Sequence, residues 1–105
     1  MINEIKKLAV DEEIIWSKHV LIRMKQRNIS IADIVNVLIN GEIIEEYMDD
    51  YPYPSYLILG VTKNNKCCHV VCAIGEGKLW IITTYIPDCE EWESDMKSRR
   101  LRNEL

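Results

Sequence analysis

Apolar residues recur with a helical spacing through the first 40 residues of the chain. A helix is predicted to begin after Ser17, whose hydroxyl suits an N-cap, and to end at Asn28. Its apolar edge consists of Val20, Leu21 and Met24. Residues 2–10 have a weaker pattern of the same kind, which favours a short amphipathic helix ahead of it.

A further helix is predicted after Ser30, a second candidate N-cap. The residues expected on its core side are Ile31, Ile34, Val35 and Leu38, and those expected on its polar side are Asp33, Asn36 and Asn40. Gly41 follows as the expected left-handed terminator.

Beyond Gly41 the apolar period changes to two, which predicts strands. The predicted strands are residues 43–48, 56–62, 67–74 and 79–86. The segment 51–54 holds two prolines, which exclude a helix there, and the remaining connections are short enough for hairpins. Such connections indicate an antiparallel meander.

The last predicted element is a C-terminal helix. Asp88 and Glu91 resemble a capping box after Pro87, and Trp92 and Met96 would be the buried edge of a helix running to about residue 102. The predicted fold class is therefore α+β: two N-terminal helices, a four-stranded antiparallel meander and a C-terminal helix, with the helices on one face. We expect a single domain over residues 1–105.

Composition and cysteine usage narrow the class of protein. No apolar run approaches the roughly 20 residues of a membrane span, and the first residues turn acidic, unlike a secretory signal. The cysteines lie mostly within one predicted strand, which is typical of apolar filling in a reducing compartment. On a strand, Cys67 and His69 point away from Cys68 and Cys72, so we expect no shared metal site. A cytoplasmic protein without membrane contact, cofactor or metal is expected.

The charges are segregated along the chain. Residues 17–28 and 97–102 each hold four Lys or Arg and no acid, whereas residues 40–50 and 88–95 each hold five acids and no base. The net charge of −4 disfavours general nucleic-acid binding by counterion release. A local basic patch is still compatible with this distribution. The alternative is that acidic and basic segments pair on the surface.

His19, Arg23 and Arg27 form the most informative group, because their spacing of four places them on one helical face. An imidazole with two guanidiniums suits a site for phosphate or another anion, with the arginines as a clamp and His19 exchanging a proton. The structural alternative is that the three side chains pair with acids such as Glu45, Glu46 or Glu91.

Other candidates lie on the strands and near the C-terminus. His69 is expected to be buried in mid-strand, either as a hydrogen-bonded core residue or as a proton-transfer group. Tyr85 ends the last strand, on the same face as Leu79, Ile81 and Thr83. Its hydroxyl is either a donor or the wet tip of a packed ring. Arg99 and Arg100 point about 100° apart on a helix, so one of them at most faces inward.

An ordered set of motifs over roughly residues 17–100 resembles the domain-of-unknown-function family numbered 4258. The matching elements are Ser17-Lys-His19, Arg23-Met24, Arg27, Ile29-Ser30, Asp33-Ile34, Leu38, Asn40-Gly41-Glu42-Ile43-Ile44, Tyr47, Pro52, Pro54, His69-Val70-Val71, Thr83-Thr84-Tyr85-Ile86-Pro87, Trp92, Asp95 and Arg99-Arg100. More distantly, the resemblance extends to RelE- and MqsR-type toxins, which are ribonucleases of toxin–antitoxin pairs. The acidic composition departs from such toxins, which are usually basic.

The resemblance implies a RelE-like, metal-independent endoribonuclease in which the ribose 2′-hydroxyl attacks the neighbouring phosphodiester. On this hypothesis Arg23 and Arg27 clamp phosphate, His19 or His69 transfers the proton, and Tyr85 is a donor. Arg99 and Arg100 would bind substrate, and the partners would be RNA or the ribosome and an antitoxin-like protein.

The rival hypothesis is a non-catalytic protein-interaction module with a structural His/Arg network. Arginines held in bidentate pairs with acids would favour it, whereas basic segments lining one concavity with Tyr85 would favour the enzyme. A neutralising antitoxin is disfavoured, because neither a wrapping tail nor a helix-turn-helix is evident. The sequence does not indicate an oligomeric state.

Overall fold

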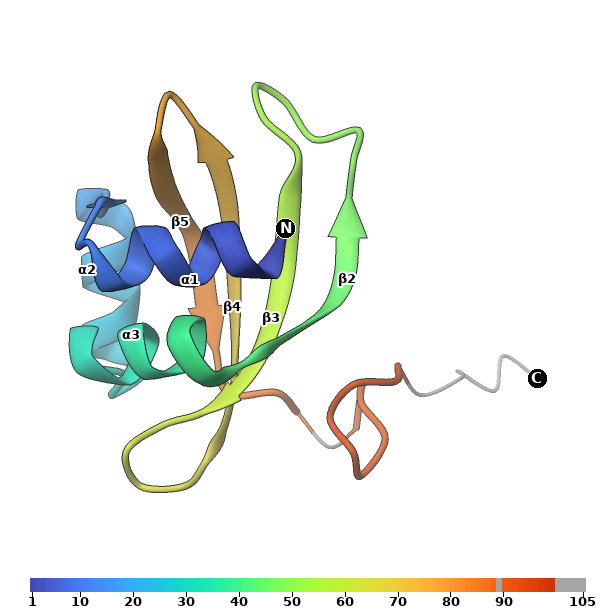
Figure 1. The fold of residues 1–105 in the computed structure, drawn as a ribbon. Helices are drawn as coiled ribbons and strands as arrows, with labels where there is room; N and C mark the ends of the chain where they lie inside the picture. The colour runs from blue at the N-terminus through green and yellow to red at the C-terminus, as the bar shows by residue number, and fades with distance from the viewer. Residues whose placement is uncertain (89, 100–105) are drawn as a thin grey trace.

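A computed structural model of the chain describes residues 1–88 and 90–99, and these residues form an α+β fold (Figure 1). The helices are α1 (Ile2–Val10), α2 (Lys18–Gln26) and α3 (Ile31–Asn40). The strands are β1 (Ile14–Ile15), β2 (Glu42–Tyr47), β3 (Ser55–Val61), β4 (Cys67–Gly75) and β5 (Lys78–Tyr85). Within the described residues, no helix has the length and apolar character needed to cross a membrane.

The strands make one mixed sheet in the order β1-β5-β4-β3-β2. Strands β2 to β5 form the predicted antiparallel meander, but the sheet has a fifth strand that the sequence pattern did not predict. β1 pairs parallel to β5, with Ile14 opposite Leu79 and Ile15 opposite Trp80. Two residues are too few to show an alternating period, so this strand depends on its long-range partner.

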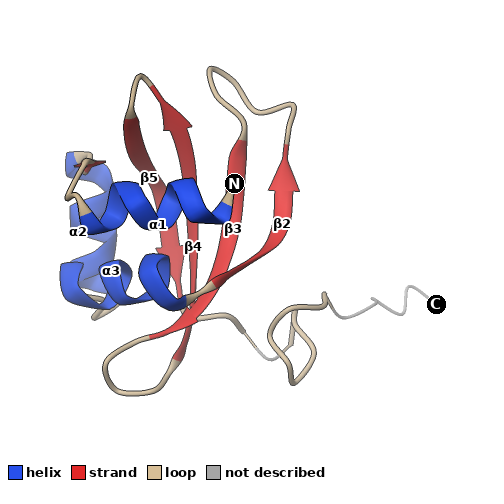
Figure 2. Cartoon of the chain, viewed as in Figure 1, coloured by secondary structure: helices blue, strands red, loops and turns tan. Residues whose placement is uncertain are grey.

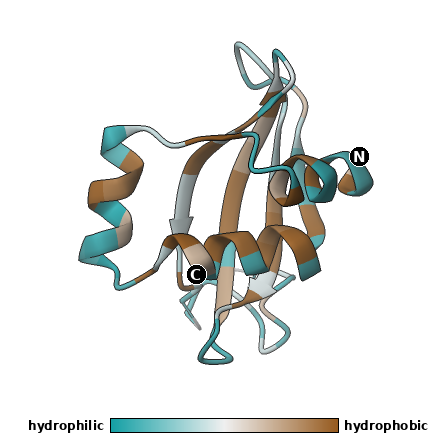
Figure 3. Ribbon diagram, turned by 60° about the vertical axis from the view of Figure 1, so that its left-hand side comes forward, coloured by the Kyte–Doolittle hydropathy of each residue, from teal (hydrophilic) through white to brown (hydrophobic). Residues whose placement is uncertain are grey.

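α1 and α3 cover one face of the sheet, and α2 packs against β5 (Figure 2). Figure 3 shows hydrophobic residues along the strands and along most of α3, whereas α1 and α2 each carry both hydrophobic and hydrophilic residues. The fully buried core residues between helices and sheet include Ile5, Ile34, Val37, Leu38, Ile58, Cys68, Val70, Cys72 and Leu79. The opposite face of the sheet, called here the open face, has no helix over it among the described residues.

The two serine caps are confirmed. Ser17 Oγ accepts a hydrogen bond from the Val20 amide at 3.1 Å, and Ser30 forms a reciprocal capping box with Asp33. The buried side of α3 differs from the prediction, because Val37 is buried, Val35 is only partly buried and Ile31 is half exposed.

Gly41 ends α3, but not as the predicted left-handed residue. Its backbone is extended, with φ −85° and ψ −173°. A glycine is required there for another reason: a Cβ atom would lie 2.4 Å from the Val37 carbonyl oxygen and 2.5 Å from that of Leu59. The close passage of α3 over β3 therefore depends on the missing side chain.

A β-bulge changes which residues of β5 share a face. The pairing with β4 shifts register between Val71 and Cys72, so Ile81 is opposite Cys72 but Thr83 is opposite Val71. Leu79 and Ile81 consequently face the helices, whereas Thr83 and Tyr85 face the open side. The prediction that all four share one face was wrong, because simple alternation ignores the extra residue.

The predicted C-terminal helix is also wrong for the described residues. Residues 90–99 form turns and bends, with an isolated bridge between Trp92 and Arg99. Trp92 is 1% exposed, and the side chains of Trp92 and Arg99 reach β4 and β2, respectively. These long-range contacts outweigh the local signals for a helix, because each such signal stabilises a helix only slightly. Residues 92–99 are called the strap below.

Candidate functional site

The predicted stripe on α2 is exposed. Val20 and Met24 bury one side of the helix in the core, so His19, Arg23 and Arg27 project to the solvent. The helix carries no acid, and the ion pairs of the described residues are Lys7–Asp11, Lys78–Glu13, Lys97–Glu42 and Arg99–Glu45. None of these includes a stripe residue. The predicted pairing of the stripe with Glu45 was wrong, since Glu45 binds Arg99 instead.

Arg27 links α2 to the sheet. Its Nη1 donates a hydrogen bond of 2.8 Å to the Thr84 carbonyl oxygen of β5. β1 covers the outer edge of β5 only at Leu79 and Trp80, so the guanidinium occupies backbone that β1 leaves unpaired. Arg27 therefore holds α2 against β5 while the residue as a whole remains exposed.

The other predicted residues gather around His69 on the open face. His69 is opposite Leu59 on β3 and Tyr85 on β5, and its side chain is fully buried. Its Nε2 lies 2.7 Å from the Met96 carbonyl oxygen, and its Nδ1 lies 3.3 Å from the Tyr85 hydroxyl. Because a carbonyl can only accept, Nε2 carries the proton, and the Tyr85 hydroxyl donates to Nδ1 of the neutral ring.

The protonation states of this pair follow from burial. Burial lowers the pKa of His69, with Arg99 acting in the same direction and the Met96 carbonyl and Glu45 opposing it. Burial also raises the pKa of Tyr85, so its hydroxyl keeps its proton at neutral pH. The pair is thus a neutral donor–acceptor contact.

Trp92 closes this cluster from the strap. Its ring meets the His69 ring edge-on, with centroids 4.5 Å apart, and the Arg99 guanidinium lies 4.6 Å from the Trp92 ring centroid. Both geometries are favourable, since the ring has a positive edge and a negative face. The sequence predicted Trp92 to be buried, but on a helix, and so did not place it against His69.

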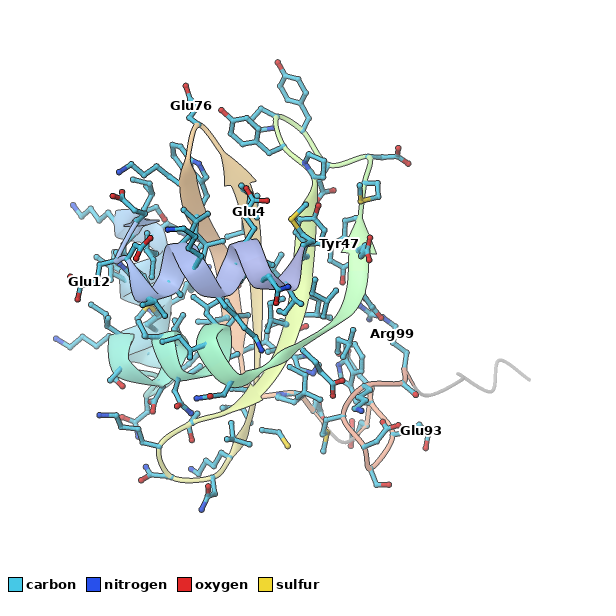
Figure 4. All side chains as sticks on the ribbon, viewed as in Figure 1. Glu4, Glu12, Tyr47, Glu76, Glu93 and Arg99 are labelled. Atoms are coloured by element: carbon cyan, nitrogen blue, oxygen red, sulfur yellow. The ribbon has the colours of Figure 1, made fainter. Side chains whose placement is uncertain are left out.

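Arg99 is held by an acid of β2. Its Nε and Nη2 donate to the two Glu45 carboxylate oxygens at 2.9 and 3.0 Å, and the Tyr47 hydroxyl donates to Oε1 at 2.5 Å. Figure 4 labels Tyr47 and Arg99. This hydrogen-bonded contact between Arg99 and Glu45 lowers the pKa of Glu45 and raises the pKa of Arg99. Burial, followed by the Glu45 contact, raises the pKa of Tyr47 to about 12.

The predicted residues therefore separate into two groups. His69, Tyr85 and Arg99 meet on the open face. His19 and Arg23 lie on α2, and Arg27 is its C-cap residue, which bonds to the β5 backbone. Arg100 lies outside the described residues. The first group is closed and its hydrogen bonds are satisfied, which is typical of a structural network. The second group is open to an external anion.

In a comparison with known protein families, residues 16–86 match the family described as "Domain of unknown function (DUF4258)". No curated protein and no solved structure matches the chain. The matched range includes α2 with its stripe, His69 and Tyr85, and it ends before the strap. The chain belongs to the DUF4258 family.

Proposed function

We propose that this protein is a metal-independent endoribonuclease of the RelE-like toxin type, with the α2 stripe as its RNA contact. The supporting observation is the exposure of His19, Arg23 and Arg27 on one helical face, apart from the ion pairs of the described residues. Lys18 and Lys25 add positive charge to the same helix, which has no acid. This local field attracts a phosphodiester backbone even though the net charge is −4.

The proposed reaction needs groups of the kind that the stripe supplies. The ribose 2′-oxygen forms a bond to phosphorus while the bond from phosphorus to the 5′-oxygen breaks. His19 accepts the 2′-hydroxyl proton, and the leaving 5′-oxygen takes a proton from water. Arg23 and Arg27 stabilise the charge on the phosphorane. The products are a 2′,3′-cyclic phosphate and a 5′-hydroxyl.

His69, Tyr85 and Arg99 have a positioning role in this proposal. His69 is fully buried and its two nitrogens have partners, so an RNA phosphate has no access to them without displacement of the strap. Arg99 already binds a carboxylate with two nitrogens. These residues hold the C-terminal segment against the sheet. Arg27 is hydrogen-bonded to the β5 edge of the same sheet.

Cleavage of a single-stranded RNA in EDTA tests the proposal. We expect His19→Ala and Arg23→Ala to lower the cleavage rate by about 10²-fold or more, since general acid–base catalysis supplies about 10²–10⁴-fold. Lys66→Ala is the matched control, because it removes an exposed cation from the β3–β4 loop and should keep the parent rate. Parent-like cleavage by both stripe variants, or no cleavage by the parent protein, would contradict the proposal.

A growth assay tests the toxin assignment separately. We expect expression of the parent chain to arrest bacterial growth, and His19→Ala expressed to the same level to permit it. Coexpression of the genomic neighbour should relieve the arrest if that neighbour is the antitoxin-like partner. Equal growth with parent and variant would contradict a toxin that acts through the stripe.

A specific observation favours a second candidate function, a non-catalytic protein-interaction module. Arg99 of the second basic segment forms a bidentate pair with Glu45, and the buried His69 joins the same network. These cations serve the fold rather than an external anion. A parent protein that neither binds nor cleaves RNA, although its fold is intact, would support this candidate over the enzyme.

A further inference from the structure

A cavity lies between the β2–β3 loop and the β4–β5 turn. Figure 1 shows that this loop and this turn lie at the end of the sheet away from the strap. Its volume is about 700 Å³. The residues that line it are Asp50, Tyr51, Pro52, Tyr53, Ala73, Glu76, Trp80, Ile81 and Ile82. None of the residues proposed for RNA contact takes part. We call this region the aromatic cavity.

Two aromatic walls of the cavity are held in place. Tyr53 lies over the Gly75 backbone, where a Cβ atom would come within 2.2 Å of its ring. The Tyr53 and Trp80 ring centroids are 6.3 Å apart, and Trp80 Nε1 donates to the Gly75 carbonyl oxygen at 2.9 Å. Tyr51 adds a third ring, which is 95% exposed and so is available to a ligand.

The charged residues of the lining are acids only. Asp50 comes from the β2–β3 loop, and Glu76 comes from the β4–β5 turn, where Figure 4 labels it. Asp50 also accepts a hydrogen bond from Ser55, which fixes its position. Hydrogen bonding to Glu76 raises the pKa of Tyr53, so this phenol stays neutral beside the carboxylate. Aromatic faces and carboxylates both attract cations and repel phosphates.

We propose that the aromatic cavity binds the guanidinium of an arginine side chain on a partner protein. A guanidinium stacks flat on aromatic rings and also donates to a carboxylate in a bidentate manner, which matches Tyr51, Trp80 and Glu76 in one cavity. A lysine ammonium lacks the planar stacking surface. The charge complementarity that carries this proposal is independent of RNA binding on α2, so the cavity is a separate protein-recognition site.

NMR of the ¹⁵N-labelled chain tests the proposal through the Trp80 indole N–H signal. The probes are an acetylated, amidated pentapeptide with one central arginine and the same peptide with citrulline, its neutral isostere. We expect the arginine peptide to shift the Trp80 signal and to bind about fivefold more tightly than the citrulline peptide. Equal affinities, or no Trp80 shift at millimolar peptide, would overturn the proposal.

Substitutions at three exposed residues test whether the peptide binds at the aromatic cavity. Tyr51→Ala and Glu76→Gln should each weaken the arginine peptide about threefold, whereas Glu12→Gln, on the α1–β1 turn, should leave its affinity unchanged. Unchanged melting temperatures establish that the variants keep the fold. A third probe is an oligouridine: if it shifts Trp80 and the arginine peptide does not, the cavity takes nucleobases and the proposal is wrong.

Discussion

Because His69 is buried, we predict that the protein loses stability on mild acidification. Its imidazole is fully buried, donates to the Met96 carbonyl and accepts from Tyr85, so the neutral ring is the form that fits. The pKa of the folded-state imidazole lies below its ordinary value of 6.5 because of burial. Protons therefore bind the unfolded chain more strongly, and the stabilising contribution present above about pH 6.5 is lost as the pH falls towards the folded-state value.

The loss of unfolding free energy has an upper limit, because only one proton, that of the His69 imidazole, is involved. The unfolding free energy falls by at most about 1.4 kcal/mol per pH unit below the unfolded-state pKa. Between about pH 7.5 and pH 5.0 the limiting loss is about 2 kcal/mol, reached if the folded imidazole stays neutral throughout. The loss levels off once the pH is below the folded-state pKa.

Urea unfolding followed by circular dichroism measures the effect. His69→Gln keeps an N–H donor for the Met96 carbonyl but does not titrate. Subtracting the variant's unfolding free energy from that of the wild type at each pH therefore removes the contribution of the carboxylates that both proteins share. We expect the difference between wild type and variant to be constant near neutral pH and to change by up to about 2 kcal/mol by pH 5.0. His19→Gln, which removes the exposed imidazole, is the control. Parallel curves for wild type and His69→Gln would refute the buried, neutral assignment.

Two further predictions concern packing and thiol chemistry. Gly41→Ala should lower the unfolding free energy by about 1–3 kcal/mol, because the new Cβ would lie 2.4 and 2.5 Å from backbone oxygens. The urea m-value should not change. An unchanged urea midpoint would contradict the close packing of α3 on β3. Burial raises the pKa of the Cys72 thiol to about 12, so iodoacetamide at pH 8 should modify the half-buried Cys67 first and leave Cys72 intact until urea is added. Peptide mass spectrometry measures both sites, and equal rates in the folded protein would show that Cys72 is accessible.

Local signals predicted the helices well because their causes are local. Ser17 and Ser30 hydrogen-bond to amides three residues away, so the caps are readable from short stretches of sequence. The strand-forming segments were predicted to within about a residue for the same reason, since alternation is a short-range pattern.

The failures involve partners that are distant in the sequence. Ile14 and Ile15 become a strand only through pairing with β5. The strap is not helical because Trp92 packs on His69 and Arg99 binds Glu45, 54 residues away. A bulge in β5, opposite Val71 and Cys72 of β4, moves Tyr85 to the open face, and no local pattern indicates where a bulge will form.

The candidate site shows the same division. The spacing of His19, Arg23 and Arg27 was sufficient to predict that they share one helical face, and the structure shows that all three are exposed. The separation of this stripe from His69 and Arg99 was not predictable, because it depends on which face of the sheet each strand residue occupies. The Arg99–Glu45 pair also required the strap to reach β2, which only the tertiary structure reveals.

RNA cleavage by the α2 stripe is the most direct measurement of function. The purified parent chain, Arg23→Ala and the control Lys66→Ala would be incubated in EDTA with the same single-stranded RNA, and the product ends identified. We predict 2′,3′-cyclic phosphate and 5′-hydroxyl ends from the parent and the control, at a rate lowered about 10²-fold or more by Arg23→Ala. Equal rates for the parent and Arg23→Ala, or an inactive parent, would contradict an endoribonuclease site on α2.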